Sequence, residues 1–69
     1  MNLKQLEAFV EVTEKNSFSK AAKSLYLTQP TVSAHISALE KELGSRLLIR
    51  NTKEVELSES GKRLYEYAK

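Results

Sequence analysis

The chain has 69 residues, enough for one small domain, and contains no cysteine. Disulfide bonds and thiolate metal sites are therefore excluded, and no apolar run approaches the ~20 residues that span a bilayer. The formal net charge is only +2, but residues 15–53 carry seven Lys and Arg against two Glu, while both flanks are net negative. A basic middle suits a polyanion that contacts one face, although chance clustering on a solvated surface would give the same pattern.

The first helix is predicted from Leu3 to Glu14. Asn2 is a good N-cap, and Gln5 stands where its capping-box partner belongs. The apolar side of this helix covers an arc of about 120° and consists of Leu3, Leu6, Phe9, Val10 and Thr13.

The second helix is predicted from Phe18 to Tyr26, with Ser17 or Ser19 as its cap and two adjacent alanines on a small apolar face. A break of only a few residues follows. The third helix is predicted from Gln29 to Leu43, because a threonine N-cap and a first-turn proline precede it and a glycine follows it. Its apolar stripe covers only about 60° and consists of Val32, Ile36, Leu39 and Leu43.

After Gly44 the apolar spacing changes from helical to alternating, which predicts a short two-stranded hairpin around the polar stretch 50–54. Ser58 is expected to cap a fourth helix from Glu59, whose pattern is still running at Lys69. The order of elements predicts a mainly α winged helix-turn-helix, with a three-helix bundle and a two-stranded β-hairpin wing. We expect residues 1–58 to form this domain and residues 59–69 to be the start of a longer linker helix.

The face of the third helix opposite its core stripe carries small side chains, which would let the helix backbone sit deep in a DNA major groove. The Gln29 amide can pair with adenine, and the positive end of the helix dipole favours a phosphate. Taken alone, Thr28 could be only a cap, Pro30 only a helix start, and the small residues ordinary surface. We expect base contacts from Gln29, Pro30, Ser33, Ala34 and Ser37, and phosphate contacts from Thr28, Thr31 and Lys41.

Two cations, Arg50 and Lys53, flank the predicted hairpin tip, from which they could reach a minor groove or its phosphates. Their charge could instead protect an edge strand from pairing. His35 is the only histidine, and without cysteines or an acidic cluster it is a poor metal ligand. We expect it to flank the core stripe or to be partly buried beside it, although it could also reach a phosphate. We expect no metal, no cofactor and no catalytic residue.

The sequence resembles the LysR-type transcriptional regulators over essentially its whole length. The matching residues include Ala21, Ala22, Leu25, Thr28, Gln29, Pro30, Ser33, Leu39, Glu40, Leu43, Gly44, Leu47, Arg50, Leu57 and Gly61. Four positions depart from the usual pattern, namely Leu48, Lys53, Ser58 and Ser60. Of these, Lys53 replaces a common arginine and lacks its planar fork, which would weaken insertion into a minor groove.

The resemblance implies a bacterial, cytoplasmic transcription factor that binds double-stranded DNA as a dimer. It implies major-groove contacts from the start of the third helix and wing contacts from Arg50 and Lys53. By the same resemblance, the linker helix pairs with its mate to form a homodimer, full-length members assemble as tetramers, and a small-molecule effector binds only in a further C-terminal domain. Dimer contacts would then come from Leu64, Tyr65 and Ala68, which could instead pack on their own domain.

Three alternatives remain beside this interpretation. The same fold occurs in other regulator families, such as the molybdate-responsive type, and some winged helices bind only protein. The small, polar outer face of the third helix, backed by Lys41, favours DNA over a protein partner. An enzyme is the weakest alternative, because the chain offers one histidine, no cysteine and no glycine-rich phosphate loop.

Overall fold

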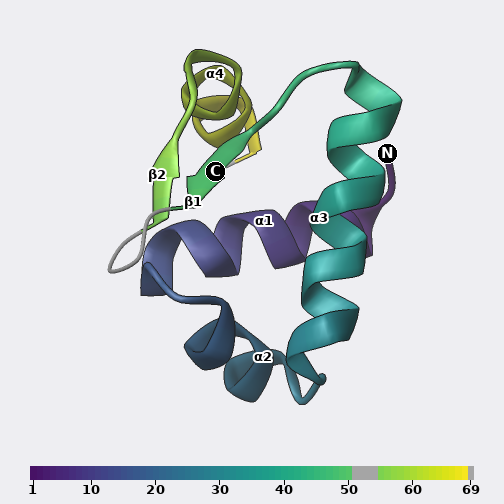
Figure 1. Ribbon diagram of the computed structural model, residues 1–69, viewed down its shortest axis with the longest axis vertical. Coiled ribbons are helices and arrows are strands. Elements are labelled where there is room, and N and C mark those ends of the chain that lie inside the picture. The colour runs from purple at the N-terminus through teal and green to yellow at the C-terminus, as the bar shows by residue number, and fades with distance from the viewer. Residues whose placement is uncertain (51–54, 69) are drawn as a thin grey trace.

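The structure is a computed structural model and describes residues 1–50 and 55–68. Within them α3 crosses α1, α2 lies at one end of both, and the two strands and α4 lie on the opposite side of α1 from α2 (Figure 1). This arrangement confirms the predicted winged helix-turn-helix. The elements in chain order are α1 (Leu3–Lys15), α2 (Phe18–Leu25), α3 (Gln29–Leu43), β1 (Leu48–Arg50), β2 (Val55–Leu57) and α4 (Glu59–Ala68).

The first two helices begin at side-chain caps that the sequence predicts. The Gln5 N–H donates to Asn2 Oδ1 at 2.8 Å, and the Asn2 N–H donates to Gln5 Oε1 at 3.2 Å, so the capping box is complete. At α2 the cap is Ser17 rather than Ser19, because Ser17 Oγ accepts from the Lys20 N–H at 3.1 Å. Each bond satisfies a backbone donor that the helix itself cannot pair.

The turn between α2 and α3 is short because α2 ends abruptly at Tyr26. This residue adopts left-handed backbone angles, with φ of 58°, so α2 stops one residue before the predicted end. The Leu27 N–H then donates back to the Ala22 carbonyl at 2.9 Å, which closes the helix end. Thr28 follows at once as the N-cap of α3, which has the predicted bounds.

Two short strands form the hairpin that we call the wing, β1 paired with β2. The pairing is antiparallel, with Leu48 opposite Leu57 and Arg50 opposite Val55. Leu47 lies just before β1 and is almost fully buried. No helix in the described part of the chain is long and apolar enough to cross a membrane.

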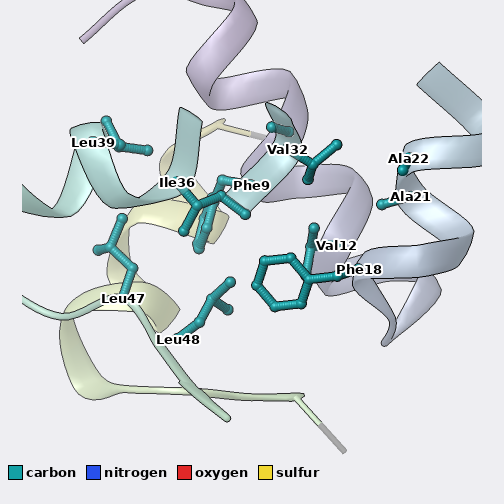
Figure 2. Packing of buried hydrophobic residues seen from close by; sticks show 11 residues of the cluster. Phe9, Val12, Phe18, Ala21, Ala22, Val32, Ile36, Leu39, Leu47 and Leu48 are labelled. Carbon is teal, nitrogen blue, oxygen red and sulfur yellow. The ribbon is translucent and has the colours of Figure 1, made fainter. Parts of the chain in front are cut away.

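The core lies where the three helices and the wing meet (Figure 2). Two expectations about its edges were wrong: Leu3 is 71% exposed and Leu43 is 42% exposed. The apolar stripe of α3 continues beyond the part of the helix that α1 covers, because the C-terminal end of α3 extends past α1 (Figure 1). The buried residues are Ala8, Phe9, Val12, Phe18, Ala21, Ala22, Val32, Ile36, Leu39, Leu47 and Leu48.

Candidate nucleic-acid interface

The outward face of α3 is a row of small and polar side chains. Opposite this face, Val32, Ile36 and Leu39 hold the helix on the core, with at most 1% of each side chain exposed. The predicted base-reading and phosphate-binding residues on α3 are all at least partly accessible. Gln29, Pro30, Thr31, Ala34, Ser37 and Lys41 are exposed, and Ser33 is half-buried among them.

Thr28 and Thr31 meet at the N-terminus of α3. Their hydroxyl oxygens are 2.8 Å apart, and the Thr31 N–H donates to Thr28 Oγ1 at 3.4 Å. Only one hydroxyl hydrogen is used between the two side chains, so the other can donate to an outside acceptor. Pro30 contributes no N–H, whereas Gln29 presents its backbone N–H at the positive end of the helix dipole. This end of α3 is suited to an anion.

A polar groove of about 320 Å³ separates α3 from the start of the wing. Sequence reasoning missed Arg46, which is exposed and lines this groove with Ser33 and Ser37. The only sequence signal for Arg46 is its place in the basic middle of the chain, because its proximity to α3 depends on the path of the loop after Gly44. The groove is lined by Ser33, Ile36, Ser37, Glu40, Arg46, Leu48 and Ile49.

The predicted wing cations lie at the limit of what the structure describes. The backbone of Arg50 ends β1 opposite Val55. Lys53 lies outside the described residues. The wing runs beside α3 with the polar groove between them, so one ligand could contact both elements at once.

His35 lies on the flank of α3, away from the row of small residues. It is half-buried, as expected, in a hollow shared with Lys4 and Glu7 of α1 and with Leu27 and Thr31. Among the described residues, no three His, Cys, Asp or Glu side chains gather as metal ligands would.

The three predicted dimer residues of α4 have different neighbours. Leu64 and Tyr65 pack against the domain's own core. The Tyr65 hydroxyl also donates to Glu14 Oε2 at 3.2 Å. The pKa of the Tyr65 phenol is raised above its ordinary value, mainly by partial burial and further by the Glu14 carboxylate. Ala68 instead borders an open, mainly apolar hollow of about 430 Å³, whose other lining residues are Leu3, Leu6, Glu7, Val10, Glu11 and Leu25.

Residues 3–62 match the family model described as bacterial regulatory helix-turn-helix protein, lysR family. The chain is 45% identical over 69 residues to the uncharacterized HTH-type transcriptional regulator YxjO of Bacillus subtilis, covering all of this chain and 24% of YxjO. It therefore spans about a quarter of the length of that curated relative.

Two solved protein–DNA complexes contain similar folds. The BenM DNA-binding domain bound to catB site 1 DNA superposes with a TM-score of 0.94 at 44% identity, covering 99% of this chain and 76% of that chain. The CbnR DNA-binding domain in complex with DNA also gives a TM-score of 0.94, at 37% identity, covering 99% of this chain and 78% of that chain.

Proposed function

Because the chain belongs to the LysR family of bacterial regulatory helix-turn-helix proteins, we propose that it binds duplex DNA with α3 in the major groove and the wing on the adjacent minor groove or backbone. The family is one of transcription regulators, so the chain is a sequence-specific DNA-binding domain and not an enzyme. The observation that carries the groove assignment is the exposed row of small side chains on α3, directly opposite its buried stripe.

The physical fit of α3 to a major groove follows from this row. A groove about 12 Å wide admits a helix whose outward side chains are short, which brings the backbone close to the base edges. Gln29, at the helix start, has the amide that can pair with adenine N6 and N7. We assign base contacts to Gln29, Pro30, Ser33, Ala34 and Ser37, and phosphate contacts to Thr28, Thr31 and Lys41.

The wing and the groove beside it supply the remaining contacts in this proposal. Arg50 and Lys53 would reach the minor groove or its phosphates, where cations are favoured by the negative potential. We add Arg46 as a further phosphate contact, because it is exposed and borders the groove between α3 and the wing.

We further propose that residues 59–69 begin a linker helix through which the regulator forms a homodimer, with contacts from Leu64, Tyr65 and Ala68. The open apolar hollow beside Ala68 supports a partner at this end of α4. A curated relative about four times as long as this chain supports a further domain. We propose that the small-molecule effector binds in that domain and that the full-length protein forms tetramers. A transcription regulator of a bacterial family works where the chromosome is, so we place this one in the cytoplasm.

The test is selection from a random duplex pool with the 69-residue domain and, in parallel, with Gln29→Ala. We expect the parent to enrich a defined site and the variant to lose preference at one position, at a cost of about 1–3 kcal/mol on the parent's site. Ser24→Ala, an exposed position on α2, is the matched control and should keep the full preference.

Two results would count against the assignment. If Gln29→Ala selects the same site with the same stringency, Gln29 does not read a base. If the parent enriches no site and shows only salt-dependent general binding, the base-reading role of α3 in this domain is wrong.

A further inference from the structure

Two polar side chains tie the wing to the helices, in addition to its apolar contacts. The first is Glu40, in the last turns of α3. Its Oε2 accepts from the Leu47 N–H at 2.7 Å and from the Leu48 N–H at 3.1 Å. Glu40 therefore holds the point at which the chain enters β1, and it does so with charge-assisted hydrogen bonds, which are roughly twice as strong as neutral ones.

The second side chain is Asn16, which ends α1. Its Oδ1 accepts from the Val55 N–H at 3.0 Å, across 39 residues of sequence. Asn16 adopts left-handed backbone angles, with φ of 53°, and asparagine tolerates these better than most residues. The side chain thus holds the first residue of β2 while the backbone turns from α1 toward α2.

The wing needs such attachments because it is small. Each strand has three residues, and an isolated two-stranded hairpin is marginally stable at best. Leu48 packs into the core and Leu57 packs against it, but burial of apolar surface is non-directional and does not by itself fix the angle between a strand and a helix. Hydrogen bonds weaken steeply as they bend, so the three bonds from Glu40 and Asn16 restrict that angle.

We propose that Glu40 and Asn16 are positioning residues, which hold β1 and β2 at the orientation to α3 that lets wing and helix engage one duplex together. This inference rests on the proposed function. It assigns no DNA contact to either residue, because the Glu40 carboxylate and the Asn16 amide oxygen are turned toward backbone N–H groups of this chain.

Glu40 offers a test in which two explanations predict opposite signs. Glu40 lines the groove between α3 and the wing, so removing its negative charge should tighten DNA binding if charge alone mattered. If Glu40 positions the wing, Glu40→Ala should weaken binding instead. Glu42→Ala removes a charge two residues away, from an exposed side chain paired with the Met1 ammonium, and is the matched control.

The variants to compare are Glu40→Ala, Glu40→Gln, Asn16→Gly and Glu42→Ala, in a duplex-binding titration over a range of salt concentrations. Glu40→Gln keeps an accepting oxygen, and Asn16→Gly keeps the left-handed backbone while removing Oδ1. For each phosphate that the wing no longer neutralises, we expect Glu40→Ala and Asn16→Gly to bind about tenfold more weakly at ~0.1 M salt, with a log–log salt slope smaller by about 0.9. Glu40→Gln should restore most of the affinity, and Glu42→Ala should bind at least as tightly as the parent.

The base preference separates positioning from general damage. Because α3 keeps its own attachment to the core, the site selected by Glu40→Ala should be the parent's site, bound more weakly. Unfolding in urea identifies any variant that is partly unfolded at the assay temperature. If Glu40→Ala is partly unfolded, the comparison of Asn16→Gly and Glu40→Gln with the parent tests the proposal instead. Parent-like affinity and salt slope in folded Glu40→Ala and Asn16→Gly overturn the positioning role alone, whereas a parent that binds no duplex overturns the proposed function itself.

Discussion

At Gly61, α4 comes very close to the segment that leads into the wing. A Cβ built on Gly61 would lie 2.1 Å from the Leu47 carbonyl oxygen and 3.2 Å from a Leu57 methyl group. The nearest of these atoms is backbone in the buried segment that leads into the wing, so it cannot move aside as a flexible side chain could. The absence of a side chain at Gly61 allows α4 to pack against both Leu47 and β2.

We expect Gly61→Ala to lower the free energy of unfolding by about 1–3 kcal/mol or more, because overpacking forces a buried backbone segment to shift. Urea unfolding followed by far-UV circular dichroism measures this change. The control is Gly44→Ala, where nothing lies within 4 Å of the new Cβ but φ is +67°, so only the backbone strain of about 1–2 kcal/mol applies. Equal stability of Gly61→Ala and the parent would contradict the contact.

Residues whose partners lie three or four positions away were predictable from the sequence. The pairing of Asn2 with Gln5, the Thr28 cap and the left-handed Gly44 were expected and are confirmed. Ser58 also begins α4 as expected, since its Oγ accepts from the Gly61 N–H at 3.0 Å. These rules are local, because a helix end leaves the same donors unpaired in every fold.

Residues whose partners are distant in sequence were not predictable. Neither the bond from Val55 to Asn16 nor the pair of bonds to Glu40 follows from spacing, because each depends on where the wing docks. Periodicity also does not show how far a neighbouring helix reaches, which is why Leu43 was placed in the core although it is 42% exposed.

At the scale of elements, α4 is attached to α1 by the hydrogen bond from Tyr65 to Glu14 and by apolar packing. Leu64 and Tyr65 contact the core, and the Tyr65 hydroxyl donates to the carboxylate of Glu14. The helix that we propose as the start of a linker is thus part of the packing of the domain. The sequence predicted the existence and start of α4 and left packing on the domain as an alternative to dimer contacts, but it did not predict the bond to Glu14.

Because of the bond between Tyr65 and Glu14, we expect the free energy of unfolding of the domain to fall with rising pH in the alkaline range. Partial burial and then the Glu14 carboxylate raise the pKa of Tyr65 in the folded chain above 10.0, while the unfolded chain ionises near pH 10. The folded state holds the proton more tightly, so this contribution is complete below about pH 10 and is lost as the pH rises through the folded pKa.

We therefore expect Tyr65→Phe to be less sensitive than the parent to a rise in pH above about 10, in urea unfolding measured from about pH 8 to 11. Tyr67→Phe is the matched control, because Tyr67 lies on the same helix and is 83% exposed. The stability of Tyr67→Phe should fall with rising pH as that of the parent does. Parallel curves for Tyr65→Phe and the parent above pH 10 would show that the bond to Glu14 has no such effect.

At the scale of the whole molecule, the polar groove beside α3 and the open apolar hollow are lined by different residues. The exposed row on α3 and the groove beside it carry Lys41 and Arg46, while the open apolar hollow lies between α1, the end of α2 and Ala68 of α4. Of the first surface, the sequence predicted the exposed row on α3, because the row follows from the helical period of one element, but not the groove with Arg46. It did not predict the second, which is assembled from three elements.

The hollow leads to a prediction about self-association. Ala68→Glu introduces a charge at its edge and should weaken the dimerisation that we propose through α4, because burying an unpaired charge at an interface is costly. Sedimentation equilibrium of the domain measures the association constant. Glu66→Ala alters an exposed position on the same helix turn, and the association constant of this variant should stay close to that of the parent. An association constant unchanged by Ala68→Glu would exclude Ala68 from the interface.

The left-handed Tyr26 has a practical consequence for spectroscopy. The chain contains no tryptophan and three tyrosines, so its near-ultraviolet emission comes from Tyr26, Tyr65 and Tyr67 alone. Tyr26 is 95% exposed and stands two residues before the cap of α3, beside the end of the helix that we place in the groove. With the other two tyrosines replaced by phenylalanine, Tyr26 becomes a single built-in fluorophore whose quenching or anisotropy reports the docking of α3 without any attached dye.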